Sequence, residues 1–314
     1  MSARIQAAGR PVGEGAAGRV LAAAGKALAT AVMALFALMA VYPILWLLVN
    51  SFKSNADYQL DKIGLPPQWY PSNYKGAWEI GDFAKLLPNS VFYTAVGTIG
   101  VVVLAASAGF AFAKFEHRAK GPMYGSFVLG ILLCLSSLMI PLFLQLSQLD
   151  LAIGTLLARL GASADPKSFH LFYNTRFGVI LVYVGSGLPL AIYLATEYVR
   201  GIPTSLVEAA RIDGASFARI FASVILPMCV PILTTVAIVT LPNIWNEFAL
   251  INIIVGKLDL QSLPLGILRF SGSRSTDYGK QFAALVLGLA PMLAFYVAFR
   301  KQITKGVSGG AVKG

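Results

Sequence analysis

Few side chains in this sequence are of a type that could do chemistry, and their spacing does not bring them together. The two cysteines, Cys134 and Cys229, fall inside apolar runs and match neither a disulfide framework nor a metal-ligand spacing. The two histidines, His117 and His170, lie in different polar segments and do not suggest a site. Because the sequence shows no His/Glu metal cluster and no nucleophile paired with a base, we expect neither a metal site nor an integral-membrane enzyme.

A lysine in a glycine context, "AAGKAL" around Gly25, invites comparison with a nucleotide-binding P-loop. The P-loop pattern requires a glycine five positions before Gly25, where Val20 stands, and Ser or Thr after the lysine, where Ala27 stands. We therefore expect no ATP site and no bound cofactor in this chain.

Charged residues gather in one stretch, "EAARIDGASFARIFASVILP", between long runs that carry almost none. Pro203 interrupts the helix expected before this stretch. Ser205, followed three residues later by Glu208, forms a capping-box pattern and predicts a helix of about two turns. Gly214 suits the left-handed conformation that ends a helix, and Ser216 suits the cap of the next one. The pattern predicts a short helix, a tight turn and a second helix.

Such an element has two interpretations. Glu208 could serve only as a cap within a plain connection between two apolar segments. A connection needs only a few residues, however, whereas this one builds a whole helix, and a short rigid helix suits docking in the groove of a partner.

The apolar composition indicates a membrane protein. Hydrophobic residues make up 57% of the chain and charged residues 12%, against about 25% charged in ordinary soluble domains. The apolar residues form blocks close to the roughly 20 residues needed to cross a bilayer, and within lipid such blocks must be helical. This length pattern disfavours a very apolar soluble bundle. The six predicted spans are residues 27–52, 91–115, 123–147, 178–196, 227–255 and 282–299.

Positive charge predicts the orientation. An even number of spans places both termini on one side, and that side also holds residues 200–222, which we call the coupling loop. The tails and loops on that side carry 14 of the 25 lysines and arginines, although together they are shorter than the loops on the other side. Both termini and the coupling loop are therefore expected to be cytoplasmic. The net charge of +11 fits a cytoplasmic face near anionic lipid and requires no nucleic acid.

The chain is expected to contain a single membrane domain with two tails. Residues 1–26 form an N-terminal tail, residues 27–303 the six-helix domain, and residues 304–314 a C-terminal tail. The N-terminal apolar run is too long for a cleaved signal peptide and is expected to remain as an anchor. In the third loop, about residues 148–177, the segment "LAIGTLLARLGA" predicts a short separate amphipathic helix.

The charged stretch resembles the EAA motif of the membrane-spanning subunits of ABC importers. That motif reads EAA, three residues, Gly, nine residues, Ile, one residue, Leu-Pro. The matching positions are Glu208, Ala209, Ala210, Gly214, Leu226 and Pro227, with Val224 where the family has Ile. The resemblance implies an all-α integral membrane protein with six transmembrane helices and a cytoplasmic coupling helix, the type I ABC importer permease fold.

Further segments resemble one branch of this family, the second of two permease subunits in maltose and multiple-sugar importers. These segments cover nearly the whole chain after residue 26, although the third loop and the N-terminal tail are longer than the family pattern. They are "YPILWLLVNSFK", "WYPSNYKGAW", "NTRFGVIL", "WNEF" and the final "GGAVKG".

The resemblance implies a multi-subunit importer in the cell membrane. Its other members are a second permease subunit, two ATPase subunits that hold ATP and Mg²⁺, and an external sugar-binding protein. The coupling helix sits in a cleft of the ATPase, where Glu208, Ala209, Ala210, Asp213 and Gly214 are the expected contacts. We give contact more weight at Asp213 and capping more weight at Glu208. The C-terminal tail, with Gly309, Gly310 and Lys313, is either without function or reaches into the ATPase interface.

A sugar path requires polar and aromatic side chains within the spans. Trp245, Asn246 and Glu247 form the most suggestive cluster, and the other candidates are Gln145, Gln148, Tyr183, Ser186 and Asn243. The alternative for Glu247 is a hydrogen bond to another span that fixes packing.

Two other transport functions are weighed. An ion-coupled secondary transporter needs ionisable groups at the midplane, but Glu247 is the only acidic residue well inside a span, and no inverted repeat is visible. A permease for an amino acid, a polyamine or phosphate would share the EAA motif, and only the branch segments oppose it.

Overall fold

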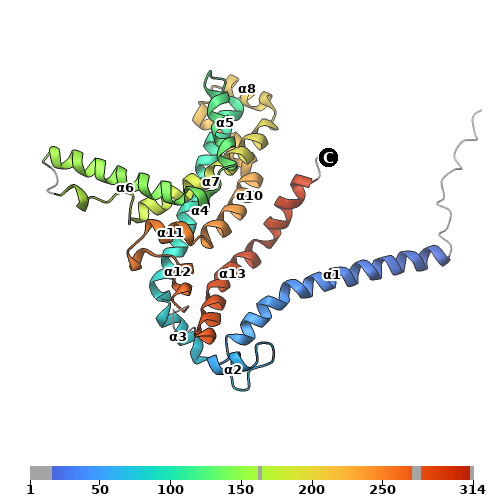
Figure 1. The fold of residues 1–314 in the computed structure, drawn as a ribbon. Helices are drawn as coiled ribbons and strands as arrows, with labels where there is room; N and C mark the ends of the chain where they lie inside the picture. The colour runs from blue at the N-terminus through green and yellow to red at the C-terminus, as the bar shows by residue number, and fades with distance from the viewer. Residues whose placement is uncertain (1–15, 162–164, 271–276, 312–314) are drawn as a thin grey trace, which may run out of the picture.

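The computed structural model of the chain describes residues 16–161, 165–270 and 277–311, and within these ranges the regular structure is helical throughout (Figure 1). Six helices are long and apolar enough to cross a membrane: 23–50, 83–114, 135–159, 176–200, 217–245 and 278–302. The predicted number of spans and the all-helical class are therefore confirmed.

The helices follow one another along the chain as a series of long spans separated by short helices. The α-helices are α1 (Ala16–Asn50), α2 (Asn55–Leu60), α3 (Ser72–Ile80), α4 (Phe83–Lys114), α5 (Lys120–Ile131), α6 (Leu135–Arg159), α7 (Arg176–Arg200), α8 (Thr204–Ile212), α9 (Phe217–Ile220), α10 (Leu226–Trp245), α11 (Ala249–Ile254), α12 (Leu263–Leu268) and α13 (Tyr278–Ala311). Short 3-10 turns, η1 (Pro166–Ser168) and η3 (Leu258–Leu260), and a π-helical segment, η2 (Phe221–Ile225), complete the structure.

The centre of the bundle is the packing of α4 against α7, with α10 beside both. Glycines allow this close approach, since a Cβ on Gly109 would lie 2.7 Å from the Ala195 Cβ and one on Gly187 would lie 2.8 Å from Val101. Small residues at helix crossings let backbones approach in a membrane, where no hydrophobic force drives one helix onto another. The three helices therefore form one tightly packed unit.

Two long helices leave this unit, as Figure 1 shows: α1 extends to one side and α6 to the other. The apolar window of α1 has no buried residue. Its Asn50 end is held by Asn73 of α3, whose Nδ2 donates to the carbonyls of Ser51 at 2.9 Å and Lys53 at 2.8 Å. The exposed lengths of α1 and α6 are apolar surfaces that face lipid or another membrane subunit.

The predicted third span, residues 123–147, is wrong as a continuous helix. The chain breaks between α5 and α6, where the amides of Leu132 and Leu133 bond to carbonyls only three residues back and Cys134 is extended. Apolar residues continue across the break, so hydropathy alone carries no sign of it. The predicted separate helix at "LAIGTLLARLGA" is also wrong, because residues 151–159 of that segment form the last turns of α6.

The third loop is fixed to α6 by a buried carboxyl group. Asp150 accepts hydrogen bonds from the backbone amides of Leu171 at 2.9 Å, Phe172 at 3.0 Å and Tyr173 at 2.7 Å. Buried carboxylates are tolerated when several donors satisfy them in this way.

Both predicted tail boundaries fall within helices. α1 begins at Ala16, inside the predicted N-terminal tail, and α13 passes residue 304 without a break and ends at Ala311. The first fifteen residues lie outside the described part of the chain.

Candidate functional site

The coupling loop folds as a short helix, a tight turn and a second helix, as the sequence predicts. α8 has nine residues, and Gly214 follows it in the left-handed conformation with φ of 77°. The Ala215 amide donates to the Ala210 carbonyl at 3.0 Å and the Gly214 amide to Arg211 at 3.0 Å, the paired bonds of a Schellman motif. The Ser216 hydroxyl then accepts from the Arg219 amide, which caps α9.

The predicted capping box of Ser205 and Glu208 is wrong. α8 begins at Thr204, so the cap position falls on Pro203, which has no side-chain acceptor. Ser205 and Glu208 lie inside the helix instead, and the Glu208 side chain is exposed. The capping role that we preferred for Glu208 is therefore lost, which leaves its carboxylate available to a partner.

One face of α8 packs on the bundle and the other is open. Val207 is buried in a cluster that includes Val199, Ile202, Ile220 and Ile225. The open face presents an 87% exposed Ile212. Of the predicted contact residues, Glu208, Ala209, Asp213 and Gly214 are exposed and Ala210 is partly buried. In Figure 1, α8 lies at one end of the bundle and α2 and α3 lie at the opposite end.

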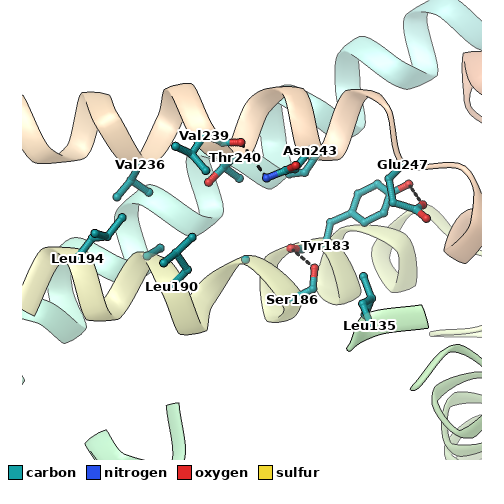
Figure 2. Close-up of a pocket in the computed structure, with 13 residues that line it drawn as sticks. Leu135, Tyr183, Ser186, Leu190, Leu194, Val236, Val239, Thr240, Asn243 and Glu247 are labelled. Atoms are coloured by element: carbon teal, nitrogen blue, oxygen red, sulfur yellow. Dashed lines mark hydrogen bonds between the residues drawn. The ribbon is translucent and has the colours of Figure 1, made fainter. Parts of the chain in front are cut away.

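A cavity of about 330 Å³ lies between α7 and α10 and is bordered by Leu135 at the start of α6 (Figure 2). Most of its polar residues, Tyr183, Ser186, Asn243 and Glu247, lie toward one end, whereas Thr240 lies beside Val239 (Figure 2). Valine and leucine side chains line the other end. A mostly apolar cavity with a few convergent polar groups is typical of small-molecule sites.

Glu247 is the most highly bonded side chain of this cavity. The Tyr183 hydroxyl lies 3.0 Å from its Oε2, as Figure 2 shows, while the amides of Leu250 and Ile251 donate to its carboxyl oxygens at 2.7 and 3.2 Å. The alternative foreseen for Glu247, a hydrogen bond to another span, is therefore present. Asn243 and Ser186 donate to carbonyls of their own helices, those of Val239 and Tyr183.

The structure does not bring the predicted cluster of Trp245, Asn246 and Glu247 together. α10 ends at Trp245, and the chain turns there, which also shows that the predicted span of residues 227–255 is wrong as one helix. Trp245 is buried against Phe83 and Leu263, and with Asn246 it lines a second, largely apolar cavity of about 450 Å³ between α10, α12 and α13. Gln145 and Gln148 lie exposed on α6, away from both cavities.

The chain matches a family of transport proteins over the region that contains the coupling loop and the cavity between α7 and α10. Residues 102–308 match the family described as "binding-protein-dependent transport system inner membrane component". The chain belongs to this family. It is 31% identical to a probable ABC transporter permease protein of Bacillus subtilis, over 89% of this chain and 86% of the relative.

Other comparisons agree with this membership. A diacetylchitobiose uptake system permease protein of Streptomyces coelicolor is 31% identical, over 91% of this chain and 89% of the relative. The fold matches a crystal structure of a bacterial ABC transporter involved in the import of the acidic polysaccharide alginate, with a TM-score of 0.71 and 20% identity, over 91% of this chain and 97% of that one. The fold is that of a type I ABC importer permease.

The C-terminal positions of the permease are only partly described. Gly309 and Gly310 lie in the last turns of α13, and Lys313 lies outside the described residues.

The turn at Gly214 yields the first prediction. Proline cannot adopt a φ of 77° and has no amide to donate to Arg211, so Gly214→Pro should break the geometry between α8 and α9. ATP-dependent solute uptake should fall below about a tenth of the wild-type rate, while the permease still inserts in the membrane, as measured by transport assay and immunoblot.

Gly161 offers a matched control because its φ of 75° is nearly the same and open space surrounds it. Gly161→Pro should disturb the backbone equally but leave uptake close to normal. Normal uptake by the Gly214 variant would show that the rigid turn has no part in coupling.

Proposed function

We propose that this permease forms half of the translocation path of an ATP-driven sugar importer and receives the work of a separate ATPase through α8. The observation that carries this proposal is that α8 ends in a Schellman motif, packs one face on the bundle, exposes the other, and lies at one end of the bundle (Figure 1). The expected assembly holds a second permease, two ATPase subunits with their ATP and Mg²⁺, and an external sugar-binding protein. This permease itself binds no nucleotide.

The orientation follows from charge and from the positions of the loops. Lysine and arginine favour the cytoplasm for the coupling loop and both termini. α8 and the α2–α3 region lie at opposite ends of the bundle, as this orientation requires. Glu208, Ala209, Asp213 and Gly214 then face the cytoplasm, while the partly buried Ala210 packs toward the bundle. The small Ala209 permits close approach, and the two carboxylates can pair with basic residues of the ATPase.

Mechanical coupling requires that α8 move as a unit. Its Val207 face is held by apolar contacts to the bundle, and its C-terminal end is fixed by the Schellman motif. When the ATPase subunits bind ATP and close, they displace α8. The packed helices α4, α7 and α10 then move, and the translocation path changes from open to the inside to open to the outside.

An uncharged sugar is the substrate that the cavity between α7 and α10 suits best. Among its described lining residues, Glu247 is the one carboxylate and none is lysine or arginine. Phosphate or an acidic solute would meet Glu247 without a cation to balance it. A polyamine would compete for carboxyl oxygens that three donors already occupy. The branch segments and the relatives named for diacetylchitobiose, starch degradation products and trehalose also favour a sugar.

Reconstitution tests this function. The permease, with its cognate permease, ATPase and binding protein, is placed in proteoliposomes with ATP inside. Labelled trehalose, maltose, diacetylchitobiose, a glucuronate disaccharide, glutamate, spermidine and phosphate are then offered outside. We expect ATP-dependent accumulation of a neutral sugar and none of the charged solutes. Accumulation of a charged solute alone, or uptake driven by an ion gradient without ATP, would refute the proposal.

Substitution of two asparagines can show which of the two cavities the sugar passes. Asn243 lines the cavity between α7 and α10, whereas Asn246 lines the second cavity with Trp245. If the sugar passes the first cavity, Asn243→Ala should raise KM roughly three- to tenfold, the loss of about one hydrogen bond. Asn246→Ala serves as the matched control and should leave KM unchanged. The reverse result would place the path beside Trp245 and Asn246.

The C-terminal segment is proposed to reach the ATPase interface. A glycine-rich segment with Gly309, Gly310 and Lys313 has little side-chain bulk and fits a narrow crevice. Deletion of residues 308–314 should lower coupled ATP hydrolysis about twofold or more, measured as phosphate release by the reconstituted complex. Equal turnover by the shortened and full-length complexes would assign the segment no such role.

A further inference from the structure

Lys114, the last residue of α4, reaches the start of the coupling loop. Its Nζ donates to the Ile202 carbonyl at 2.6 Å, and Ile202 is the buried residue immediately before Pro203. In the described ranges no acidic side chain lies within salt-bridge distance of Lys114, and its ammonium group bonds to this backbone carbonyl instead. Ile202 lies two residues after the last residue of α7 and two before the first residue of α8, so the bond falls on the connection between these helices. The bond therefore ties the backbone next to α8 to a different helix.

Aromatic side chains make a second connection at the same place. Phe115 packs edge-on against Phe217 of α9 with ring centroids 4.9 Å apart, and Phe110 of α4 lies 5.4 Å from Phe221 of η2. Arg211 of α8 stands 4.9 Å above the Phe217 ring. Cation–π and aromatic contacts have preferred geometries, so these contacts fix the positions of α8 and α9 relative to α4.

The other end of α4 holds the loop on the opposite face. The Asn89 Nδ2 donates to the carbonyls of Asp259 at 2.7 Å and Gln261 at 3.1 Å, and the Tyr93 hydroxyl donates to Leu260 at 2.8 Å. The Ser90 hydroxyl accepts from the Leu263 amide at 2.7 Å. Three positions on one face of α4, 89, 90 and 93, thus bind η3, the residue after it and the start of α12.

We infer that α4 is the mechanical link between the coupling loop and the opposite-face loop of residues 256–270, with Lys114 as the positioning residue that attaches it to the backbone just before α8. The inference rests on the proposed function, because it takes α8 as the site where the ATPase acts. α4 packs closely along α7 and α10, so its displacement moves both walls of the cavity. A signal from a binding protein on the opposite face returns along the same helix.

A purely structural role for Lys114 predicts a different result. If the Lys114 bond only stabilised the fold, its loss would lower the amount of complex and its melting temperature but leave the energetics of each remaining complex unchanged. The ratio of solute transported to ATP hydrolysed, and the stimulation of ATP hydrolysis by loaded binding protein, are therefore the decisive readouts.

The experiment compares Lys114→Met with Lys114→Arg in the complete reconstituted complex. Methionine keeps the apolar stem and removes the donor, whereas arginine keeps a charged donor. Lys120→Met is the control, since Lys120 is also near the same membrane face but forms an ordinary i,i+4 pair with Glu116. The probe is the neutral disaccharide from the uptake panel that the wild-type complex accumulates fastest.

We expect Lys114→Met to reduce the transport-to-ATP ratio and the binding-protein stimulation by roughly threefold or more. Lys114→Arg should restore most of both, and Lys120→Met should leave both unchanged. Unaltered ratios in Lys114→Met, or an equal loss in Lys114→Arg, would overturn the inference.

Asn89→Ala keeps the inference testable if Lys114→Met fails to assemble. This substitution removes the hydrogen bonds from α4 to the opposite-face loop and should lower the stimulation of ATP hydrolysis by loaded binding protein. Lys85→Met, at an exposed position near the same end of α4, is its control. Normal stimulation in Asn89→Ala would overturn the inference. A wild-type complex that accumulates no sugar would refute the proposed function, whereas a functional wild type with unaffected variants refutes only the role of α4.

Discussion

The structure depends on one constraint, which is that every backbone polar group within the membrane must find a partner inside the protein. Helices satisfy it along their length, so the critical places are the points where helices stop. The turn between α10 and α11 shows the solution, because the Glu247 carboxyl accepts the amides of Leu250 and Ile251 at the start of α11. The same group meets the Tyr183 hydroxyl of α7, so a single side chain both permits the turn and joins two spans.

This constraint explains why polar groups are found at the cavity at all. A helix that ended without Glu247 would leave amides unpaired at a cost of about 1–3 kcal/mol each. The side chain needed for the turn then brings a carboxyl group and a tyrosine beside Ser186 and Asn243, at the polar end of the cavity. The Glu247 side chain thus pairs the backbone amides at the turn and also places hydrogen-bonding groups in the cavity, which a polar solute would need.

The sequence predicted the class, the number of spans and the coupling loop, because these depend on local patterns. Hydropathy gives the spans, and Gly214 and Ser216 mark the turn and the second cap, which the structure confirms. The break before Leu135 and the reach of α6 were not predicted, since apolar residues continue across the break. Trp245, Asn246 and Glu247 were predicted together because they adjoin in sequence, but a helix end directs neighbours to opposite sides.

The contacts of Lys114 could not be predicted from the sequence either, because they depend on tertiary packing. A lysine at a helix end is normally exposed and lacks any local pattern that marks a partner 88 residues away. The tertiary packing of α4 on α7 gives it that partner, since the glycine and alanine crossing draws their ends together. Local patterns therefore identify α8, the element on which we propose the ATPase acts, whereas the close helix packing determines which helix is bonded to its connection. This division is physically reasonable under the proposed function, because α8 would have to fit a separate protein while α4 needs only to fit its own neighbours.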